Sequence, residues 1–208
     1  AVAGAAASAG RATGCSCADQ RWCSPITAPP PPHEVFAFAV AIGGTTAEQW
    51  PGFNWDLVTT VAWDVGANET VCDAHRRGVR VIIPVAGPFA LYGHGPNSAA
   101  YARLVLNASA RSEWVAAQLA RVASKGADGL VFDIEGAEQV KNKTAAGLVS
   151  LVSELRTKAR AVNPHFQISF TTPAYVAQKY IDQDGVGYDW VSLKQLVDVS
   201  HTRVGAGG

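Results

Sequence analysis

The sequence of 208 residues has little charge, no excess of either sign and few cysteines. Charged residues make up 16% of the chain, and its 17 basic residues balance its 17 acidic ones. Bulk charge therefore gives no reason to expect nucleic acid or a membrane surface as a partner. No apolar run is long enough to cross a membrane. An apolar share of 48% in a chain of this length is typical of one globular domain with a real core, and we expect a monomer.

The scarce cysteines are unevenly placed. Cys15, Cys17 and Cys23 cluster near the N-terminus, and Cys72 stands alone. An even count allows two disulfides, with three possible connectivities. A zinc site would need Cys/His pairs at ligand spacing; Cys72 and His75 offer one such pair, but Cys15 and Cys17 are too close for the usual knuckle. We therefore favour disulfides, with a metal site and free thiols as alternatives, expect no cofactor, and assign His75 a structural role.

Three sequons begin at Asn68, Asn107 and Asn142, and each is a candidate glycosylation site. Residues 1–9 are small and apolar, and the chain contains no methionine. Such a beginning is typical of the tail of a signal peptide or of a ragged mature end. Together with the paired cysteines, these features favour the secretory pathway.

The chain divides into three segments by composition. Residues 1–14 are low-complexity Ala and Gly, either a signal-peptide remnant or a disordered N-terminus. Residues 15–33 are rich in cysteine and proline, and Pro29 to Pro32 are expected to be extended. Residues 34–208 carry alternating strand and helix patterns. The expected strands are 34–40, 59–65, 79–86, 128–135 and 167–172. The expected helices are 70–77, before Gly78, then 109–124, which Lys125-Gly126 ends, and one that Thr144 caps and Asn163-Pro164 stops. The expected apolar face of the third helix consists of Leu148, Leu151, Val152, Leu155 and Ala159.

This alternation of strands and helices predicts parallel βαβ units. Two common folds are built from such units, a doubly wound sheet and a (β/α)8 barrel. Periodicity alone does not choose between them.

The octapeptide Asp128-Gly129-Leu130-Val131-Phe132-Asp133-Ile134-Glu135 is the most informative part of the chain. Its apolar run predicts a buried parallel strand, in which a carboxylate is costly unless it is paired, hydrogen-bonded or used. Asp133 and Glu135 are two residues apart, so on a strand both side chains point to one face. Two carboxyls at one strand end indicate general acid/base chemistry; the alternative is a pair satisfied by arginine or backbone amides. Asp128 begins the strand, and we favour a supporting role for it.

The octapeptide resembles the DGxxxDxE signature of glycoside hydrolase family 18, the chitinase group. The resemblance extends over roughly residues 15 to 190, and includes Asn54-Trp55-Asp56 and Cys72-Asp73-Ala74-His75. It implies a (β/α)8 barrel over residues 34–208, with active residues at the carboxyl ends of the strands. Only five or six of eight strands are expected, with a sixth beginning at Asp189-Trp190-Val191. We therefore expect a C-terminally truncated barrel that is marginally stable, poorly active or both.

The resemblance also implies a reaction and its residues. Glu135 takes the position of the acid that protonates the leaving glycosidic oxygen, and Asp133 that of the group orienting the substrate's N-acetyl group. The acetamido oxygen itself attacks the anomeric carbon, which retains configuration and makes this chemistry an exception to the usual carboxylate pair. The implied substrates are oligosaccharides of β-1,4-linked N-acetylglucosamine, including chitin oligosaccharides and the chitobiose core of asparagine-linked glycans. The implied location is the lysosome, with secretion as the alternative.

Two other residues bear on this interpretation. Val131 stands where the family usually has Asp or Asn, so Asp133 lacks that polar neighbour. Trp63 falls at a strand end and is a candidate for stacking on sugar, although core packing is the commoner use of tryptophan. Val131 and the truncation favour a non-catalytic carbohydrate-binding protein or inactive isoform as one alternative. A further alternative is an unrelated α/β domain in which the octapeptide is accidental.

Overall fold

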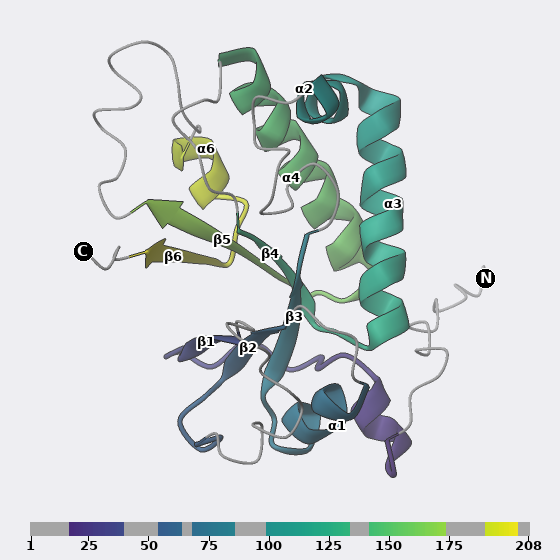
Figure 1. The fold of residues 1–208 in the computed structure, drawn as a ribbon, viewed down its shortest axis with the longest axis vertical. Coiled ribbons are helices and arrows are strands. Elements are labelled where there is room, and N and C mark those ends of the chain that lie inside the picture. Colours follow the sequence, from purple (N-terminus) through teal and green to yellow (C-terminus); the bar gives the residue numbers. More distant parts are fainter. Residues whose placement is uncertain are drawn as a thin grey trace, which may run out of the picture. The chain divides into compact units, whose positions relative to one another are not determined.

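The computed structural model describes residues 17–39, 54–63, 68–85, 99–133, 142–173 and 190–203 (Figure 1). These residues form two compact units. The first contains the described residues up to Ile83, with Ala120–Asp128 and Ala159–Phe166. The second contains Pro84–Leu119, Gly129–Lys158 and the described residues from Gln167 onward.

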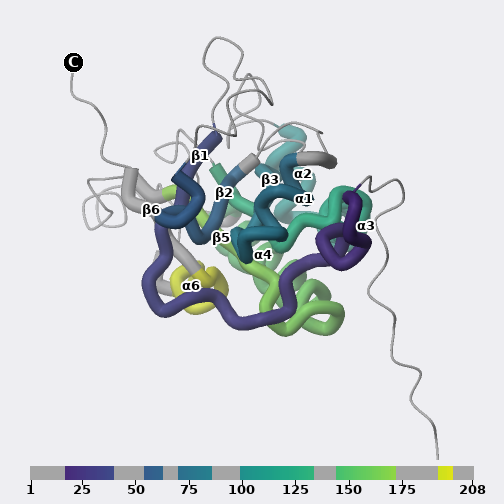
Figure 2. The backbone as a smooth tube through the Cα atoms, turned by 90° about the horizontal axis from the view of Figure 1, so that it is seen from below, coloured from purple at the N-terminus to yellow at the C-terminus, as the bar shows by residue number. Residues whose placement is uncertain are grey.

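The first unit is built on parallel strands in chain order. β1 (Phe36–Ala39) pairs with β2 (Thr60–Trp63), and β2 pairs with β3 (Arg80–Pro84), of which Pro84 is counted in the second unit. Figure 2 shows β1 and β2 side by side. The helix α1 (Asn68–Arg76) connects β2 to β3, as parallel strands require, and the short 3-10 helix η1 (Gln20–Cys23) precedes the strands.

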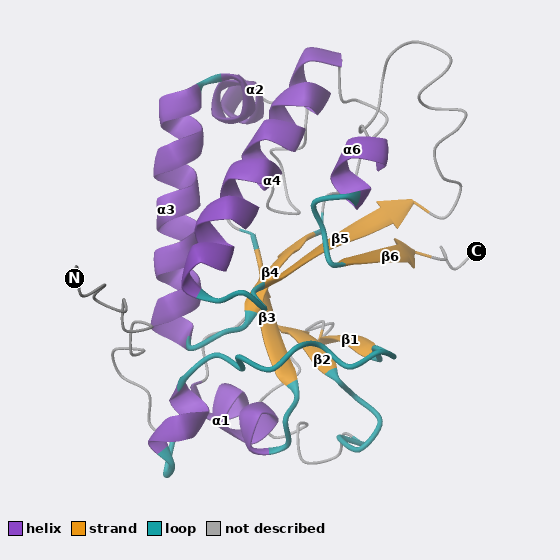
Figure 3. Cartoon of the chain, turned by 180° about the vertical axis from the view of Figure 1, so that it is seen from behind, coloured by secondary structure: helices purple, strands orange, loops and turns teal. Residues whose placement is uncertain are grey.

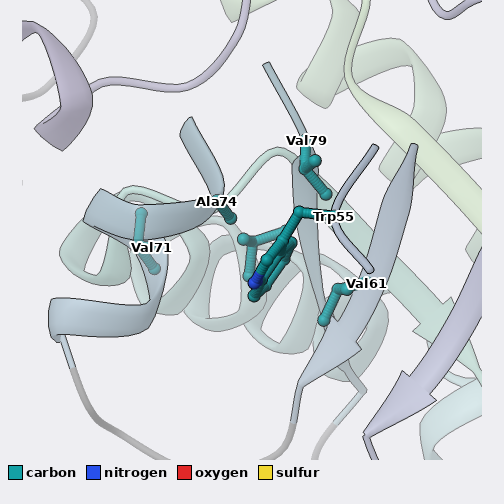
Figure 4. Close-up of a cluster of buried hydrophobic side chains, with 6 residues drawn as sticks. Trp55, Val61, Val71, Ala74 and Val79 are labelled. Carbon is teal, nitrogen blue, oxygen red and sulfur yellow. The ribbon is translucent and has the colours of Figure 1, made fainter. Parts of the chain in front are cut away.

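The core of this unit forms around Trp55. Figure 4 shows its indole among Val61 of β2, Ala74 of α1 and Val79. All of these side chains are buried, and Arg77 lies over the Trp55 ring, with its guanidinium carbon 5.3 Å from the ring centroid. Burial of this apolar cluster explains why α1 packs on the β2–β3 pair.

The second unit repeats the parallel arrangement with longer helices. β4 (Gly129–Phe132) pairs with β5 (Gln167–Pro173), and β5 pairs with β6 (Val199–Arg203). The helices are α2 (Ala99–Leu106), α3 (Ala108–Lys125), α4 (Asn142–Val162) and α6 (Trp190–Lys194), of which α3 from Ala120 and α4 from Ala159 are counted in the first unit. Figure 3 shows α3 and α4 alongside one another, where Lys158 of α4 donates to Ser112 of α3 at 3.3 Å.

The predicted apolar face of α4 is confirmed. The five side chains of this face are fully buried: Leu148, Leu151, Val152, Leu155 and Ala159. On β4 and β5, Phe132 stacks on Phe170 with centroids 5.2 Å apart, and Trp114 of α3 lies 6.2 Å from Phe132. These aromatic rings occupy one face of the strand pair and leave the opposite face to the residues that alternate with them.

Two helices end at glycines in the left-handed region. Gly78 follows α1 with φ of 74°, and Gly126 follows α3 with φ of 64°. In both places the next residue donates its N–H to a carbonyl five residues back, Val79 to Ala74 and Ala127 to Val122. These are Schellman motifs, and they turn the chain directly from each helix into the following strand.

The five strands expected from the sequence are all present, with ends shifted by a few residues. The sixth strand was predicted in the wrong place. Trp190–Lys194 forms the helix α6, and the strand β6 follows at Val199–Arg203. Leu193 is fully buried, which helical spacing achieves for this segment. Thr144 is not the cap of α4, because the helix already begins at Asn142, and α2 was not predicted.

Candidate active site

Asp133 lies at the carboxyl end of β4, directly after Phe132. Its carboxylate oxygen Oδ1 accepts a hydrogen bond from the hydroxyl of Thr171 on β5 at 2.9 Å. The same hydroxyl oxygen is 3.3 Å from the carbonyl of Phe132. A hydroxyl has one proton, and the shorter contact to a carboxylate is the stronger one, so we assign that proton to Asp133.

The pairing of β4 with β5 creates this contact. Val131 lies opposite Ser169 and Phe132 opposite Phe170, so residue 133 comes next to residue 171. Since successive side chains alternate between faces, Val131 and Asp133 share one face with Ser169 and Thr171. The stacked phenylalanines cover the other face. β5 therefore presents a polar row beside the aspartate, in which Gln167 donates to Ser169 at 3.2 Å.

Val131 lies within this polar face. Its side chain is fully buried, while its carbonyl accepts from the amide of Val85 at 3.0 Å. An isopropyl group offers no hydrogen bond to Asp133. Position 131 therefore supplies no polar contact to Asp133, and the described contact comes from Thr171 on the neighbouring strand.

Other predicted site residues are only partly described. Glu135, the expected acid, lies outside the described residues. Trp63 ends β2, but the position of its side chain is not described. Asn107 is exposed between α2 and α3, where its side-chain oxygen accepts from the amide of Ala110 at 3.0 Å and caps α3. Asn68 and Asn142 are the first residues of α1 and α4.

Asp128 has a very different environment from Asp133. Its side chain is completely buried at the start of β4. Three groups donate to its carboxylate: the amides of Ile26 at 2.5 Å and Val81 at 2.6 Å, and the imidazole of His75 at 2.9 Å. The arrangement satisfies a buried carboxylate through both backbone and side chain, which is what burial of a charge requires.

His75 faces an oxygen atom with each of its ring nitrogens. Nε2 is 2.9 Å from Asp128, and Nδ1 is 2.8 Å from the carbonyl of Trp22. Both oxygens are acceptors, so only the doubly protonated ring satisfies both contacts. Burial by itself lowers the pKa of His75, but Asp128 and the Trp22 carbonyl outweigh burial and the nearby Arg80, so the pKa is raised.

The N-terminal segment is held to the rest of the first unit at several further points. Cys17 forms a disulfide with Cys72, and Cys23 is also disulfide-bonded. The guanidinium of the buried Arg80 donates to the carbonyls of Ala28 and, at 3.1 Å, His165. Cys15 lies outside the described residues. Because Cys72 is in a disulfide, the zinc alternative loses its thiolate at that position, and no cluster of metal-binding side chains occurs among the described residues.

Sequence reasoning missed the partners of both aspartates. Ile26 and Val81 are 102 and 47 residues from Asp128, so no local pattern connects them. The sequence did contain a signal for Thr171. Gln167, Ser169 and Thr171 alternate with apolar residues along this strand, which places three polar side chains on one of its faces. No helix within the described ranges has the length and apolar character needed to cross a membrane.

The chain is similar to curated chitobiases. It is 27% identical over 179 residues to the Dictyostelium discoideum protein named "Probable di-N-acetylchitobiase 2", and 28% identical over 145 residues to the di-N-acetylchitobiase of Rattus norvegicus. The alignments cover 83% and 67% of this chain but 41% and 33% of those relatives. No protein-family model matches the chain.

Solved chitinases share its fold. Catalytic domain 2 of the group II chitinase of Ostrinia furnacalis is 22% identical with a TM-score of 0.56, over 80% of this chain and 49% of that domain. A family 18 chitinase from Cycas revoluta, solved with (GlcNAc)4, is 18% identical with a TM-score of 0.56, over 80% and 53%. The chain is similar in sequence to di-N-acetylchitobiases and in fold to chitinases.

This relationship confirms the choice of fold made from the octapeptide. The solved neighbours are (β/α)8 chitinase domains, so the parallel strands of this chain correspond to part of such a barrel rather than to a doubly wound sheet. In that fold, residues at the carboxyl ends of strands face the active site. Asp133 has that position after β4, and Asp128 has the opposite one before it.

Proposed function

We propose that this chain is a glycosidase that hydrolyses β-1,4 linkages between N-acetylglucosamine units. The observation that supports it best is Asp133, held by Thr171 at the carboxyl end of β4 within a chitinase-type octapeptide. The similarity to proteins named di-N-acetylchitobiase supports the same chemistry. The proposed substrates are chitin oligosaccharides and the chitobiose core of asparagine-linked glycans.

In the proposed reaction, Glu135 gives a proton to the glycosidic oxygen as the bond from that oxygen to the anomeric carbon breaks. The acetamido oxygen of the same sugar forms a bond to the anomeric carbon in its place. Asp133 orients the acetamido group and stabilises the positive charge that develops on it. Water then adds to the anomeric carbon, gives its proton to Glu135 and releases the acetamido group, so configuration is retained.

Asp128 has a supporting role in this proposal. Its three hydrogen bonds fix the start of β4 against Val81, Ile26 and His75. A strand fixed at its start holds the residues at its end in a defined position, which catalysis requires to within a fraction of an ångström. Asp128 therefore acts through structure and not through contact with the sugar.

The proposed setting is the lysosome, with secretion as the alternative. Disulfides such as Cys17–Cys72 persist in oxidising compartments, and Asn107 is an exposed sequon between two helices. The protonated form of His75 that its two acceptors require is also the form that acidic conditions favour. We propose that the protein acts as a monomer without a cofactor.

The experiment that tests this function measures release of sugar from N,N′-diacetylchitobiose and its longer oligomers. Glu135→Gln removes the proton donor and is expected to lower kcat by about a hundredfold to ten-thousandfold. Glu113→Gln, on the exposed surface of α3, is the matched control and is expected to keep full turnover. A substrate with a free amine in place of the acetamido group should not be cleaved. Turnover that survives Glu135→Gln would refute the proposal.

Val131 supports a second candidate, a carbohydrate-binding protein without turnover. Its buried side chain removes a polar group from the face that carries Asp133. Calorimetric titration with chitin oligosaccharides separates the two candidates. Binding without hydrolysis by the unaltered chain would select the second, and neither binding nor hydrolysis by a folded sample would favour an unrelated α/β domain.

A further inference from the structure

We infer that Thr171 is a positioning residue, whose hydroxyl holds Asp133 in place of the polar neighbour that Val131 does not supply. The inference rests on the proposed function for its catalytic consequence, but the contact itself stands on geometry. The hydroxyl is 2.9 Å from the carboxylate oxygen Oδ1. Among the described residues, Thr171 is the one that donates a hydrogen bond to this carboxylate.

The strand pairing makes this contact rigid. Phe132 and Phe170 are partners in the β4–β5 register and stack with their planes 7° apart, so the residues that follow them are brought together. β5 is in turn paired with β6, where Thr171 lies opposite His201. Threonine is branched at Cβ and has few χ1 rotamers, so its hydroxyl has little freedom to move away.

The chemistry of the contact fits a group that orients substrate. A hydrogen bond from a hydroxyl to a carboxylate is charge-assisted and stronger than one between neutral groups. It fixes the rotation of the Asp133 side chain and occupies one of its two oxygen atoms. The second oxygen then has a defined direction in which to accept a hydrogen bond from the acetamido N–H of a bound sugar.

The hydroxyl of Thr171 therefore compensates for the missing polar group at Val131. In the octapeptide, position 131 is two residues before Asp133 and on the same face, and here it is apolar and buried. The donor instead comes from across the strand pair. The chemical consequence is that the carboxylate interacts with a neutral hydroxyl group, and not with a second ionisable carboxyl with which it would share a proton.

The test compares Thr171→Val, which removes the hydroxyl and keeps the shape, with Thr171→Ser, which keeps the hydroxyl. On a chitobiose substrate, Thr171→Val is expected to lower kcat about tenfold to a hundredfold with KM changed less, and Thr171→Ser to restore most of it. Thr157→Val is the control, since that exposed hydroxyl donates to Ser153 within α4 at 2.9 Å. Unchanged kcat in Thr171→Val would overturn the inference.

A second readout does not depend on turnover. The carboxyl ¹³C resonance of Asp133 reports its hydrogen bonding and should shift in Thr171→Val, return in Thr171→Ser and stay unchanged in Thr157→Val. If the unaltered chain hydrolyses nothing, the proposed function fails, while a shifted resonance still supports the positioning contact. If the resonance does not move in Thr171→Val, the inference fails whatever the chain does to sugars.

Discussion

Two aspartates five residues apart, Asp128 before β4 and Asp133 after it, have opposite environments. Asp128 is completely buried and accepts hydrogen bonds from two backbone amides and His75. Asp133 is half-buried, and among the described residues it accepts one from Thr171. The side chains are chemically identical, so the difference comes from the surroundings alone. A carboxylate surrounded by donors of its own chain contributes to folding, and one with a single donor keeps an oxygen atom for a ligand.

The two ends of the strand between them also differ in how many contacts hold them. At its start, Asp128 belongs to a unit whose N-terminal segment is fastened by the Cys17–Cys72 disulfide and by Arg80. At its end, Asp133 contacts a neighbouring strand through one hydroxyl. Substitution at the start of the strand is therefore expected to lower the free energy of unfolding. Substitution at its end is expected to change catalysis and to leave the free energy of unfolding nearly unaltered.

The largest expected effect comes from Asp128→Ala. This change leaves the imidazole of His75 and the amides of Ile26 and Val81 buried without their acceptor, and is expected to cost about 3–5 kcal/mol of unfolding free energy. Urea titration measures it. Asp73→Ala is the control, because Asp73 forms exposed ion pairs with Arg76 and Arg77 and its loss is expected to cost less than about 1 kcal/mol. Equal costs for the two variants would remove the contrast between buried and exposed carboxylates.

Gly129→Ala probes the strand between the two aspartates. A Cβ at this position would lie 2.0 Å from the carbonyl oxygen of Gln167, which is backbone and has to move. The expected loss is about 1–3 kcal/mol, as for an overpacked core, and it should also displace Asp133 relative to Thr171. Gly78→Ala is the comparison, because open space surrounds that Cβ and only the positive φ opposes it. A loss for Gly129→Ala no greater than that for Gly78→Ala would contradict the close approach of β4 and β5.

A smaller effect is expected from pH. The pKa of His75 is raised above its unfolded value of about 6.5, so its stabilisation is fully present below about pH 6.5 and is lost as pH rises through the folded pKa. The groups facing His75 are Asp128, which favours the charged ring, and Arg80, which opposes it. Unfolding free energies measured from about pH 5 to about pH 8 should therefore fall, and His75→Gln should flatten that fall. An unchanged slope in this variant would show that other groups control the pH dependence.

Local sequence patterns were sufficient to predict those parts of the fold that depend on contacts between residues close together in the chain. Gly78 and Gly126 marked the ends of two helices, because a positive φ there needs glycine. The apolar spacing from Leu148 to Ala159 specified the buried face of α4. The error at Trp190 and Val191 came from the family resemblance, which placed the sixth strand there. The segment Trp190–Lys194 instead forms the helix α6, in which Leu193 is buried.

The candidate site depended on contacts between distant residues. The octapeptide predicts that Asp133 and Glu135 share one face of the strand, and this stays a prediction because Glu135 lies outside the described residues. That the polar partner of Asp133 would be Thr171 followed only from the register of β4 against β5, which the sequence does not specify. The same holds for Asp128, for which a supporting role was expected but the partners Ile26 and Val81 were not.

The most direct test compares Asp128→Asn with Asp133→Asn in two assays, thermal unfolding and hydrolysis of N,N′-diacetylchitobiose oligomers. We expect Asp133→Asn to lower kcat by about a hundredfold or more while the Tm changes by less than about 2 °C. Asp128→Asn should lower the Tm by several times that amount, because the buried His75 loses its carboxylate. Unaltered turnover in Asp133→Asn, or an unchanged Tm in Asp128→Asn, would contradict the assignment of chemistry to one end of β4 and of stability to the other.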